Sequence, residues 1–209
     1  MNIDSLKSLK DIWKEASEEK NFRYCFFVSL LLLVFTMIIF SKFSQFIEMR
    51  EGVQFVDPLL TRISAYDLTW LIFSLIYGAI ISAIIILLYN PKRLVLLFFA
   101  YTIMVLIRIV MMYLLPLNTP QGMIFLQDPF VSLFVTGKTL TRDLFFSGHT
   151  ATMFLLFLTT PKKFKKIFLL ATMMVAASVL FQKVHYTIDV VTAPFVSYVT
   201  YSLARHILS

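Results

Sequence analysis

Six stretches of mostly apolar residues, each close to the length of a membrane-crossing helix, recur along the chain and limit how it can fold. They cover residues 24–40, 68–89, 94–117, 145–160, 167–184 and 188–203. A helix needs roughly 20 apolar residues to cross a bilayer. The fourth stretch is short and the sixth contains Pro194, so these two are the weakest. The pattern predicts an all-α integral membrane bundle of about six transmembrane helices.

Composition supports a membrane protein and argues against a soluble domain. Hydrophobic residues make up 59% of the 209 residues, and only 15% are charged. The mean hydropathy of +0.82 is far above that of soluble domains. The net charge of +7 suits an anionic lipid leaflet. No nucleic-acid-binding motif accompanies the charge, so we expect no nucleic-acid partner.

The first 23 residues differ from the rest of the chain. Apolar residues recur there at intervals of three and four among lysines and acids, at Ile3, Leu6, Leu9, Ile12 and Trp13. This spacing predicts an amphipathic helix on the cytoplasmic membrane surface, or alternatively one packed on a cytosolic partner. We therefore divide the chain into a cytoplasmic helix, residues 1–23, and a six-span domain, residues 24–209.

The distribution of lysine and arginine predicts the orientation. Twelve of these residues lie near the span ends on the side of the termini and six near the ends on the other side, with Arg108 inside the third span. Because cytoplasmic loops carry the excess of positive charge, both termini are expected in the cytoplasm. The loop from 118 to 146 would then face the outer side, which is periplasmic, extracellular or lumenal.

Two short motifs place histidines at the mouths of apolar segments: FSGHT at 146–150 and HYTID at 185–189. A lone histidine at a helix end is more often a hydrogen-bonded interface residue than a catalyst. Here two such motifs lie at one predicted membrane level, which favours a functional site. In a helix His185 and Asp189 would share a face, so the carboxylate could orient the imidazole.

The residues at this level suit phosphoryl transfer without a metal. One imidazole can attack phosphorus, the other can protonate the leaving oxygen, and guanidinium groups can balance the developing charge. Arg108 is expected in the outer half of the third span. Ser147 and Gly148 at a helix start would let backbone N–H groups approach a phosphate.

The Ser-Gly-His run at 147–149 and the His-x-x-x-Asp run at 185–189 resemble two motifs of the type 2 phosphatidic acid phosphatase superfamily. Together with Asp143 and the segment 108–116, they are most similar to the sphingomyelin synthase branch. The resemblance covers residues 108–190. It implies a six-span enzyme of lipid phosphate chemistry, with His185 as nucleophile, Asp189 as its partner and His149 as general acid.

The chain departs from the phosphatases of that superfamily. Ser178 and Val179 stand where a Ser-Arg pair precedes the motif histidine, and Phe146 stands where proline precedes Ser-Gly-His. One phosphate-binding arginine is therefore missing, which favours transfer over hydrolysis. Arg108 could instead pair with Asp128, and Arg142 with Asp143 could be only an external ion pair.

We therefore expect a lipid phosphotransferase acting through a phosphohistidine, with a lipid phosphate phosphatase as the alternative. The candidate catalytic residues are His149, His185 and Asp189; the candidate phosphate- or substrate-binding residues are Arg108, Ser147, Gly148, Lys138, Arg142, Asp143, Thr150 and Tyr186. Membrane lipids are the expected donor and acceptor, without a cofactor or metal, and homo-oligomerisation is left open. A zinc hydrolase and a proton-coupled transporter are the less favoured alternatives.

Overall fold

The computed structural model describes residues 8–128 and 141–209, and this part of the chain is all-α, as predicted. Its α-helices are α1 (Leu9–Glu18), α2 (Lys20–Glu48), α3 (Thr69–Leu88), α4 (Pro91–Leu114), α6 (Gly148–Thr159), α7 (Lys165–Phe181) and α8 (Thr187–Ile207). Two 3-10 turns, η1 (Leu60–Arg62) and η2 (Lys162–Phe164), complete the described elements.

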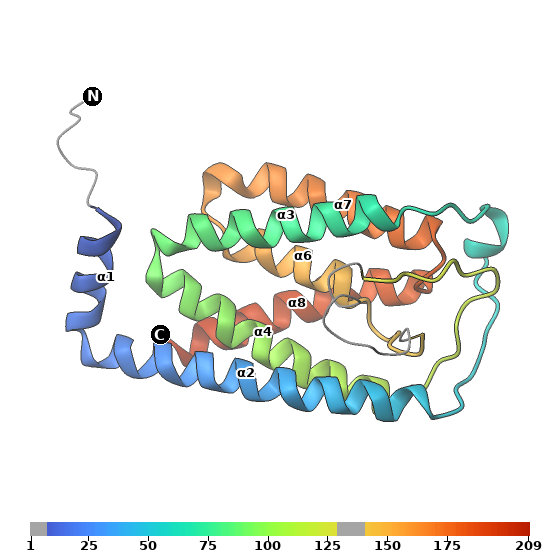
Figure 1. Cartoon of the computed structure of the whole chain (residues 1–209), viewed down its shortest axis with the longest axis horizontal. Helices are drawn as coiled ribbons and strands as arrows, with labels where there is room; N and C mark the ends of the chain where they lie inside the picture. Colours follow the sequence, from blue (N-terminus) through green and yellow to red (C-terminus); the bar gives the residue numbers. More distant parts are fainter. Residues whose placement is uncertain (1–7, 129–140) are drawn as a thin grey trace.

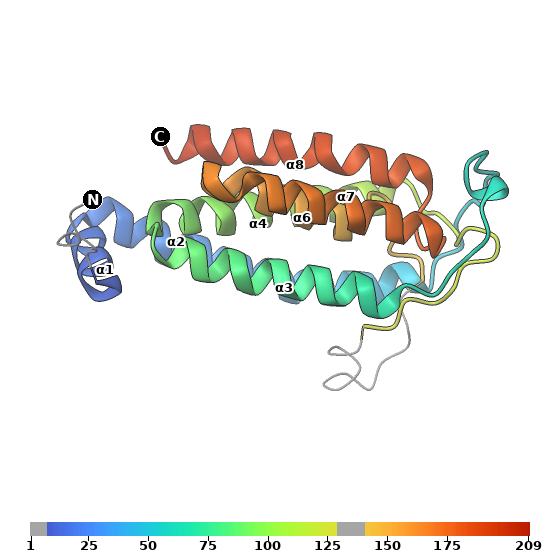
Figure 2. The same cartoon turned by 90° about the horizontal axis from the view of Figure 1, so that it is seen from above.

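The six helices from α2 to α8 run roughly along one axis, and α1 turns away from them at one end (Figures 1 and 2). The C-terminus, α1 and the α3–α4 turn lie at that end, which we call the terminal end. The segments that follow α2, α4 and α7 lie at the opposite end, on the right of Figure 1, which we call the loop end. Helix α8 begins at the loop end, and the short helix α6 begins farther inside the bundle, on the side of that end.

Four helices in the described residues are long and apolar enough to cross a membrane: α2, α3, α4 and η2 continued into α7. The chain is thus a multi-pass membrane protein, but the prediction of about six spans is not confirmed. Helix α6 has 12 residues, which is about 18 Å at 1.5 Å per residue and shorter than a bilayer core of about 30 Å. Helix α8 continues through Pro194, so the expected interruption is absent, although its polar residues lower its hydropathy.

Helix α6 lies inside the bundle, where protein rather than lipid surrounds it, so its length need not match the thickness of a bilayer. It packs against α3, α4, α7 and α8, and Ala151, Met153 and Leu155 are fully buried. The hydroxyl of Ser197 on α8 donates to the carbonyl of Ala151 at 3.0 Å. This packing places the first turn of α6 beside the first turn of α8.

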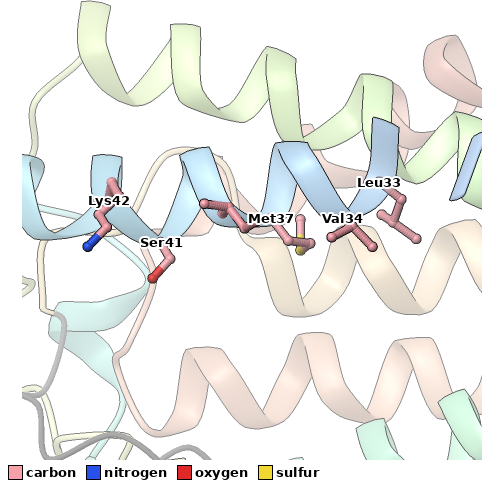
Figure 3. A pocket seen from close by; sticks show the side chains of 6 residues that line it. Leu33, Val34, Met37, Ser41 and Lys42 are labelled. Atoms are coloured by element: carbon pink, nitrogen blue, oxygen red, sulfur yellow. The ribbon is translucent and has the colours of Figure 1, made fainter. Parts of the chain in front are cut away.

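Helix α2 lies at the edge of the bundle, mainly against α4. Its outer face carries a shallow hollow of about 500 Å³, shown in Figure 3. The hollow is lined by Leu33, Val34, Met37, Ile38, Ser41 and Lys42. None of the predicted site residues lines it, and its apolar side chains suit contact with lipid tails.

The terminal end is held by caps and by basic residues. Asn90 caps α4, and Pro91 occupies its first turn, where a missing N–H costs no helix hydrogen bond. The guanidinium of Arg93 donates to the carbonyls of Thr159 and Thr160 at 3.0 and 3.1 Å, so it satisfies the end of α6. The indole of Trp13 donates to the carbonyl of Leu88 at 2.9 Å. These bonds join α1, α3, α4 and α6 at one level.

Candidate active site

The first turn of α6 carries the Ser-Gly-His run. Ser147 is its N-cap: the hydroxyl accepts from the N–H of Thr150 at 3.4 Å and lies 3.2 Å from its hydroxyl. Serine favours this position because its oxygen satisfies a helix N–H that has no partner. The N–H of Ser147 donates to the carbonyl of Asp189 at 3.1 Å. One hydrogen bond therefore joins the two sequence motifs directly.

The first turn of α8 carries the other motif. Tyr186 is the N-cap, and its N–H donates to Oδ2 of Asp189 at 3.0 Å as part of a capping box. His185 precedes the helix, so the prediction that His185 and Asp189 share a helical face is wrong. The two side chains still meet, with Nδ1 of His185 lying 3.6 Å from Oδ2 of Asp189. The capping turn, rather than helical spacing, brings them together.

The two histidines, one from each motif, are in contact. Nδ1 of His149 lies 3.4 Å from Nε2 of His185, and the rings meet edge to face with centroids 5.7 Å apart. His185 is only 2% exposed, whereas His149 is half-buried. Phe73 of α3 packs edge-on against His149 at 6.2 Å between centroids. The structure thus brings together the three predicted catalytic residues.

The pair His185 and Asp189 retains unused hydrogen-bonding capacity. Among the described residues, neither Nδ1 of His185 nor Oδ1 of Asp189 has a hydrogen-bond partner, although both atoms are buried. Most buried polar atoms in folded proteins have a hydrogen-bond partner, so two without one at the same place are unusual. With its proton on Nδ1, next to the carboxylate, His185 would direct the lone pair of Nε2 toward His149. This tautomer is the one that a nucleophilic imidazole requires.

Arg108 reaches the site from α4 and is 4% exposed. Its Nε and Nη2 donate to Oδ1 of Asp143 at 3.1 and 2.5 Å, Nη2 also donates to the Asp143 carbonyl, and Nη1 donates to the carbonyl of Phe146. Its partner is Asp143, not Asp128, the carboxylate named in the alternative to phosphate binding. The guanidinium also packs on Gly148, where an added Cβ would lie 2.8 Å from Cζ. Arg108 thus holds the turn that leads into α6.

Arg142 binds the end of α2. Its guanidinium donates to the carbonyls of Glu48 and Arg50 at the end of α2. The backbone N–H of Arg142 donates to the Glu48 carboxylate at 3.0 Å. It caps a helix C-terminus, where positive charge is stabilising. It is therefore not paired with Asp143 as one alternative had it.

The remaining predicted binding residues do not lie together. Thr150 is buried against Ser147. Tyr186 directs its hydroxyl to the carbonyl of Asn118 at 2.9 Å, away from the imidazoles. Lys138 lies outside the described residues. The structure therefore assembles His149, His185, Asp189, Ser147, Gly148, Arg108 and Asp143 at one place, and it gives Arg142 and Tyr186 contacts elsewhere.

Residues 142–207 match the family model described as PAP2 superfamily C-terminal. That family is the sphingomyelin synthase-like branch, so the predicted resemblance is confirmed for residues 142–190. The rest of the predicted range, residues 108–141, lies outside the match. The match includes both histidine motifs and excludes α1 to α4. No curated protein and no solved structure gave a significant match to the chain.

The described residues offer no ready-made metal centre. No group of three or more His, Cys, Asp or Glu side chains able to hold a metal ion occurs in residues 8–128 and 141–209. A zinc site needs three or four such ligands. The described side chains therefore give the zinc hydrolase alternative no support.

Several residues that support the PAP2 segment escaped the sequence reasoning. Phe73 packs on His149, Glu48 binds the backbone ahead of Asp143, and Asp57 binds the start of α8. All three come from outside the matched segment. Only Asp57 carried a local signal, because an Asp-Pro pair favours a turn. The contacts of the other two depend on packing between distant helices.

Proposed function

We propose that this protein is a membrane lipid phosphotransferase that moves a phosphate or phospho-head group from one lipid to another. The observation that carries the proposal is the 3.4 Å approach of His149 Nδ1 to His185 Nε2 within a PAP2 segment. Two imidazoles in this arrangement can act as nucleophile and proton donor on the same phosphorus. The protein's own residues supply each role, and no cofactor is required.

In the first step, Nε2 of His185 forms a bond to phosphorus while the bond from phosphorus to the donor alcohol oxygen breaks. Protonated His149 gives its proton to that oxygen, and the alcohol leaves. Asp189 stabilises the positive charge that develops on His185. The N–H groups at the start of α6 and its dipole stabilise the negative oxygens. Because phosphorus passes between the attacking nitrogen and the leaving oxygen, the rings must separate when substrate binds.

In the second step, neutral His149 takes the proton from an acceptor hydroxyl. The acceptor oxygen forms a bond to phosphorus as the phosphorus–nitrogen bond breaks, which restores His185. A lipid alcohol as acceptor makes the protein a synthase, and water as acceptor makes it a phosphatase.

Two observations favour transfer over hydrolysis. The nucleophile and its carboxylate are 2% and 0% exposed, and a site that excludes water protects a reactive intermediate from hydrolysis. Val179 also replaces an arginine expected in the phosphatases. The phosphatase remains the second candidate because His149, which would activate the acceptor, is only half-buried and can meet water.

We further propose that the site faces the outer side of the membrane. Helix α8 begins at the loop end and α6 begins on the side of that end, opposite the C-terminus and α1 (Figure 1). Lysine and arginine are concentrated near the termini, which favours a cytoplasmic terminal end. A protease-sensitive tag placed after Ser209 should be cut in inside-out vesicles and protected in right-side-out vesicles. The reverse result would contradict this orientation.

The decisive experiment uses purified protein in nanodiscs with labelled phosphatidic acid, phosphatidylcholine or phosphatidylethanolamine, each with and without ceramide or diacylglycerol. A labelled phospholipid that appears only when the acceptor is added indicates transfer. Free labelled phosphate from phosphatidic acid, or a free labelled phospho-head group from the other two lipids, indicates hydrolysis. A His185→Ala variant that processes these lipids at the wild-type rate would refute both candidates.

His206→Ala is the matched control for that variant, because His206 is exposed at the other end of α8. It should keep the wild-type rate. A chelator should leave the activity unchanged if the described residues act without a metal.

A further inference from the structure

The loop between α2 and α3 carries a buried carboxylate that no catalytic role uses. Asp57 is 6% exposed, yet it lies in an irregular segment at the loop end. Its Oδ1 accepts from the N–H groups of Leu59 and Leu60 at 2.9 and 3.2 Å. These local bonds form an Asx-type turn that fixes the direction of the carboxylate.

The other contacts of Asp57 are with Thr187, which lies 130 positions later in the chain. Oδ2 accepts from the N–H of Thr187 at 2.7 Å, and Oδ1 accepts from its hydroxyl at 3.0 Å. Thr187 is the first residue of α8 and follows His185 by two positions. A carboxylate at a helix N-terminus satisfies free N–H groups and interacts favourably with the helix dipole. Asp57 thus caps α8 from a distant loop.

The same loop holds the residue between His185 and Thr187. The ring of Phe55 stacks on Tyr186 with centroids 3.9 Å apart, and the Tyr186 hydroxyl donates to the carbonyl of Asn118. The loop is itself fastened to the segment after α4, since Val53 and Leu117 form a β-bridge. The backbone of Thr187 and the side chain of Tyr186, which follow His185, are therefore both held by segments at the loop end.

Gly52 explains why the two segments approach so closely. A Cβ at this position would lie 2.8 Å from the backbone nitrogens of Leu117 and Asn118. The side chain of Asn118 in turn donates to the Gly52 carbonyl at 2.7 Å and accepts from its N–H at 3.2 Å. The loop that carries Asp57 is therefore joined to a second segment rather than lying alone on the surface.

We propose that Asp57 is a positioning residue for His185, which holds the start of α8 so that Nε2 of His185 faces His149. The inference rests on the proposed function, since it assigns a role in the same reaction. Asp57 touches neither imidazole, so it acts through Thr187 and the short chain that joins it to His185. Its removal should impair the chemical step and leave lipid binding largely intact.

The test compares Asp57→Ala with Asp67→Ala in the nanodisc assay. Asp67 is the matched control because it lies in the same loop and also caps a helix start, accepting from the N–H of Thr69 at 3.0 Å, but it is exposed. Asp57→Ala should lower kcat roughly tenfold to a hundredfold with little change in KM, as expected for a misplaced reactive group. Asp67→Ala should retain the wild-type kcat.

Two further variants separate positioning from loss of folding. Asp57→Asn keeps a side-chain oxygen that can accept from Thr187, so it should recover part of the lost kcat. Thr187→Val removes one of the two bonds between α8 and Asp57 and should lower kcat in the same direction by a smaller factor. Each rate is measured well below the midpoint of thermal unfolding of that variant.

A readout without lipid substrate distinguishes this inference from the proposed function. The rate at which diethyl pyrocarbonate modifies His185, followed by mass spectrometry, should rise in Asp57→Ala, while that of His206 should not change. Wild-type kcat and wild-type labelling in Asp57→Ala, together with an inactive His185→Ala, would overturn the positioning role alone. Full activity of His185→Ala would overturn the proposed function instead, and altered labelling in Asp57→Ala would still report the anchoring of His185.

Discussion

Nδ1 of His149 and Nε2 of His185 lie 3.4 Å apart, although 36 positions separate the two residues in the chain. They meet because the first turns of α6 and α8 are joined by the hydrogen bond from the Ser147 N–H to the Asp189 carbonyl. The arrangement permits one residue to attack phosphorus while the other transfers a proton.

Replacement of either histidine should stop the reaction. We expect His185→Ala and His149→Ala each to lower kcat by roughly a thousandfold or more, since nucleophile and acid–base partner act as a unit. Rapid acid quench with lipid labelled in its phosphate should trap a phosphoenzyme in the wild type and none in His185→Ala. A phosphoenzyme that persists in His185→Ala would show that another residue is the nucleophile.

Asp189→Asn should leave the fold intact and reduce the rate strongly. Asparagine can still accept from the Tyr186 N–H, so the capping box survives, but it lacks the charge that stabilises a positive His185. We expect kcat to fall by about a hundredfold to ten-thousandfold, by analogy with other carboxylate–imidazole pairs. The midpoint of thermal unfolding should change little. An unchanged kcat would mean that the 3.6 Å contact has no catalytic role.

Gly148→Ala should be harmful because the guanidinium of Arg108 occupies the space of a methyl group. The added Cβ would lie 2.8 Å from Cζ of a buried side chain, and such overpacking costs about 1–3 kcal/mol. Activity should fall with stability, since the start of α6 must shift. Gly78→Ala is the control, because nothing lies within 4 Å of its Cβ position in the middle of α3. It should raise stability by about 0.5–1 kcal/mol. Equal melting temperatures for the two variants would contradict this account.

The pair of Arg108 and Asp143 should behave as a coupled unit. Removal of one partner leaves an uncompensated charge, which costs roughly 3 kcal/mol at a buried site, and less here because Asp143 is 26% exposed. Arg108→Met and Asp143→Leu should therefore each destabilise the protein more than the double variant does. The measurement is a double-mutant cycle on thermal unfolding in detergent. Additive effects would show that the pair does not hold the turn before α6. A rise in KM for Arg108→Met would add a role in phosphate binding.

Stability in acid should depend on Asp57. Burial alone would raise the pKa of this carboxyl, but hydrogen bonds from Thr187, Leu60 and Leu59 outweigh it and hold the pKa below its ordinary value of 3.8. A lowered folded-state pKa means that the ionised form stabilises the fold fully above pH 3.8. This contribution is lost as the pH falls below 3.8 and through the folded-state value.

The difference in melting temperature between the wild type and Asp57→Asn should accordingly be constant from pH 7 to about pH 5 and shrink below about pH 4. Circular dichroism at a series of pH values measures it. A difference that grows as the pH falls would reverse the sign and contradict the hydrogen bonds assigned to Asp57.

In the sequence, the apolar stretches predicted the helices, and the two motifs indicated which residues could form the candidate site. All six stretches overlap described helices, because a helix satisfies the backbone N–H and C=O groups of a long apolar segment within the segment itself. The number of these helices that cross the membrane does not follow from the apolar stretches alone. Helix α6 is short and is surrounded by four other helices, and no local pattern in the sequence records such packing.

Residue types were enough to select the candidate site residues, whereas the geometry of the candidate site could not be predicted from them. His149, His185 and Asp189 stood out because histidine and aspartate are costly inside apolar membrane segments and are therefore rare there. Tertiary structure decided that His185 precedes α8, that Arg108 binds Asp143, and that Arg142 caps α2. Each of these contacts depends on which groups folding brings within hydrogen-bond distance. The two partners can lie far apart in the sequence: Asp57 and Thr187 are separated by 130 positions. Sequence periodicity reports which face of a segment avoids water, but it does not specify which other segment will cover that face.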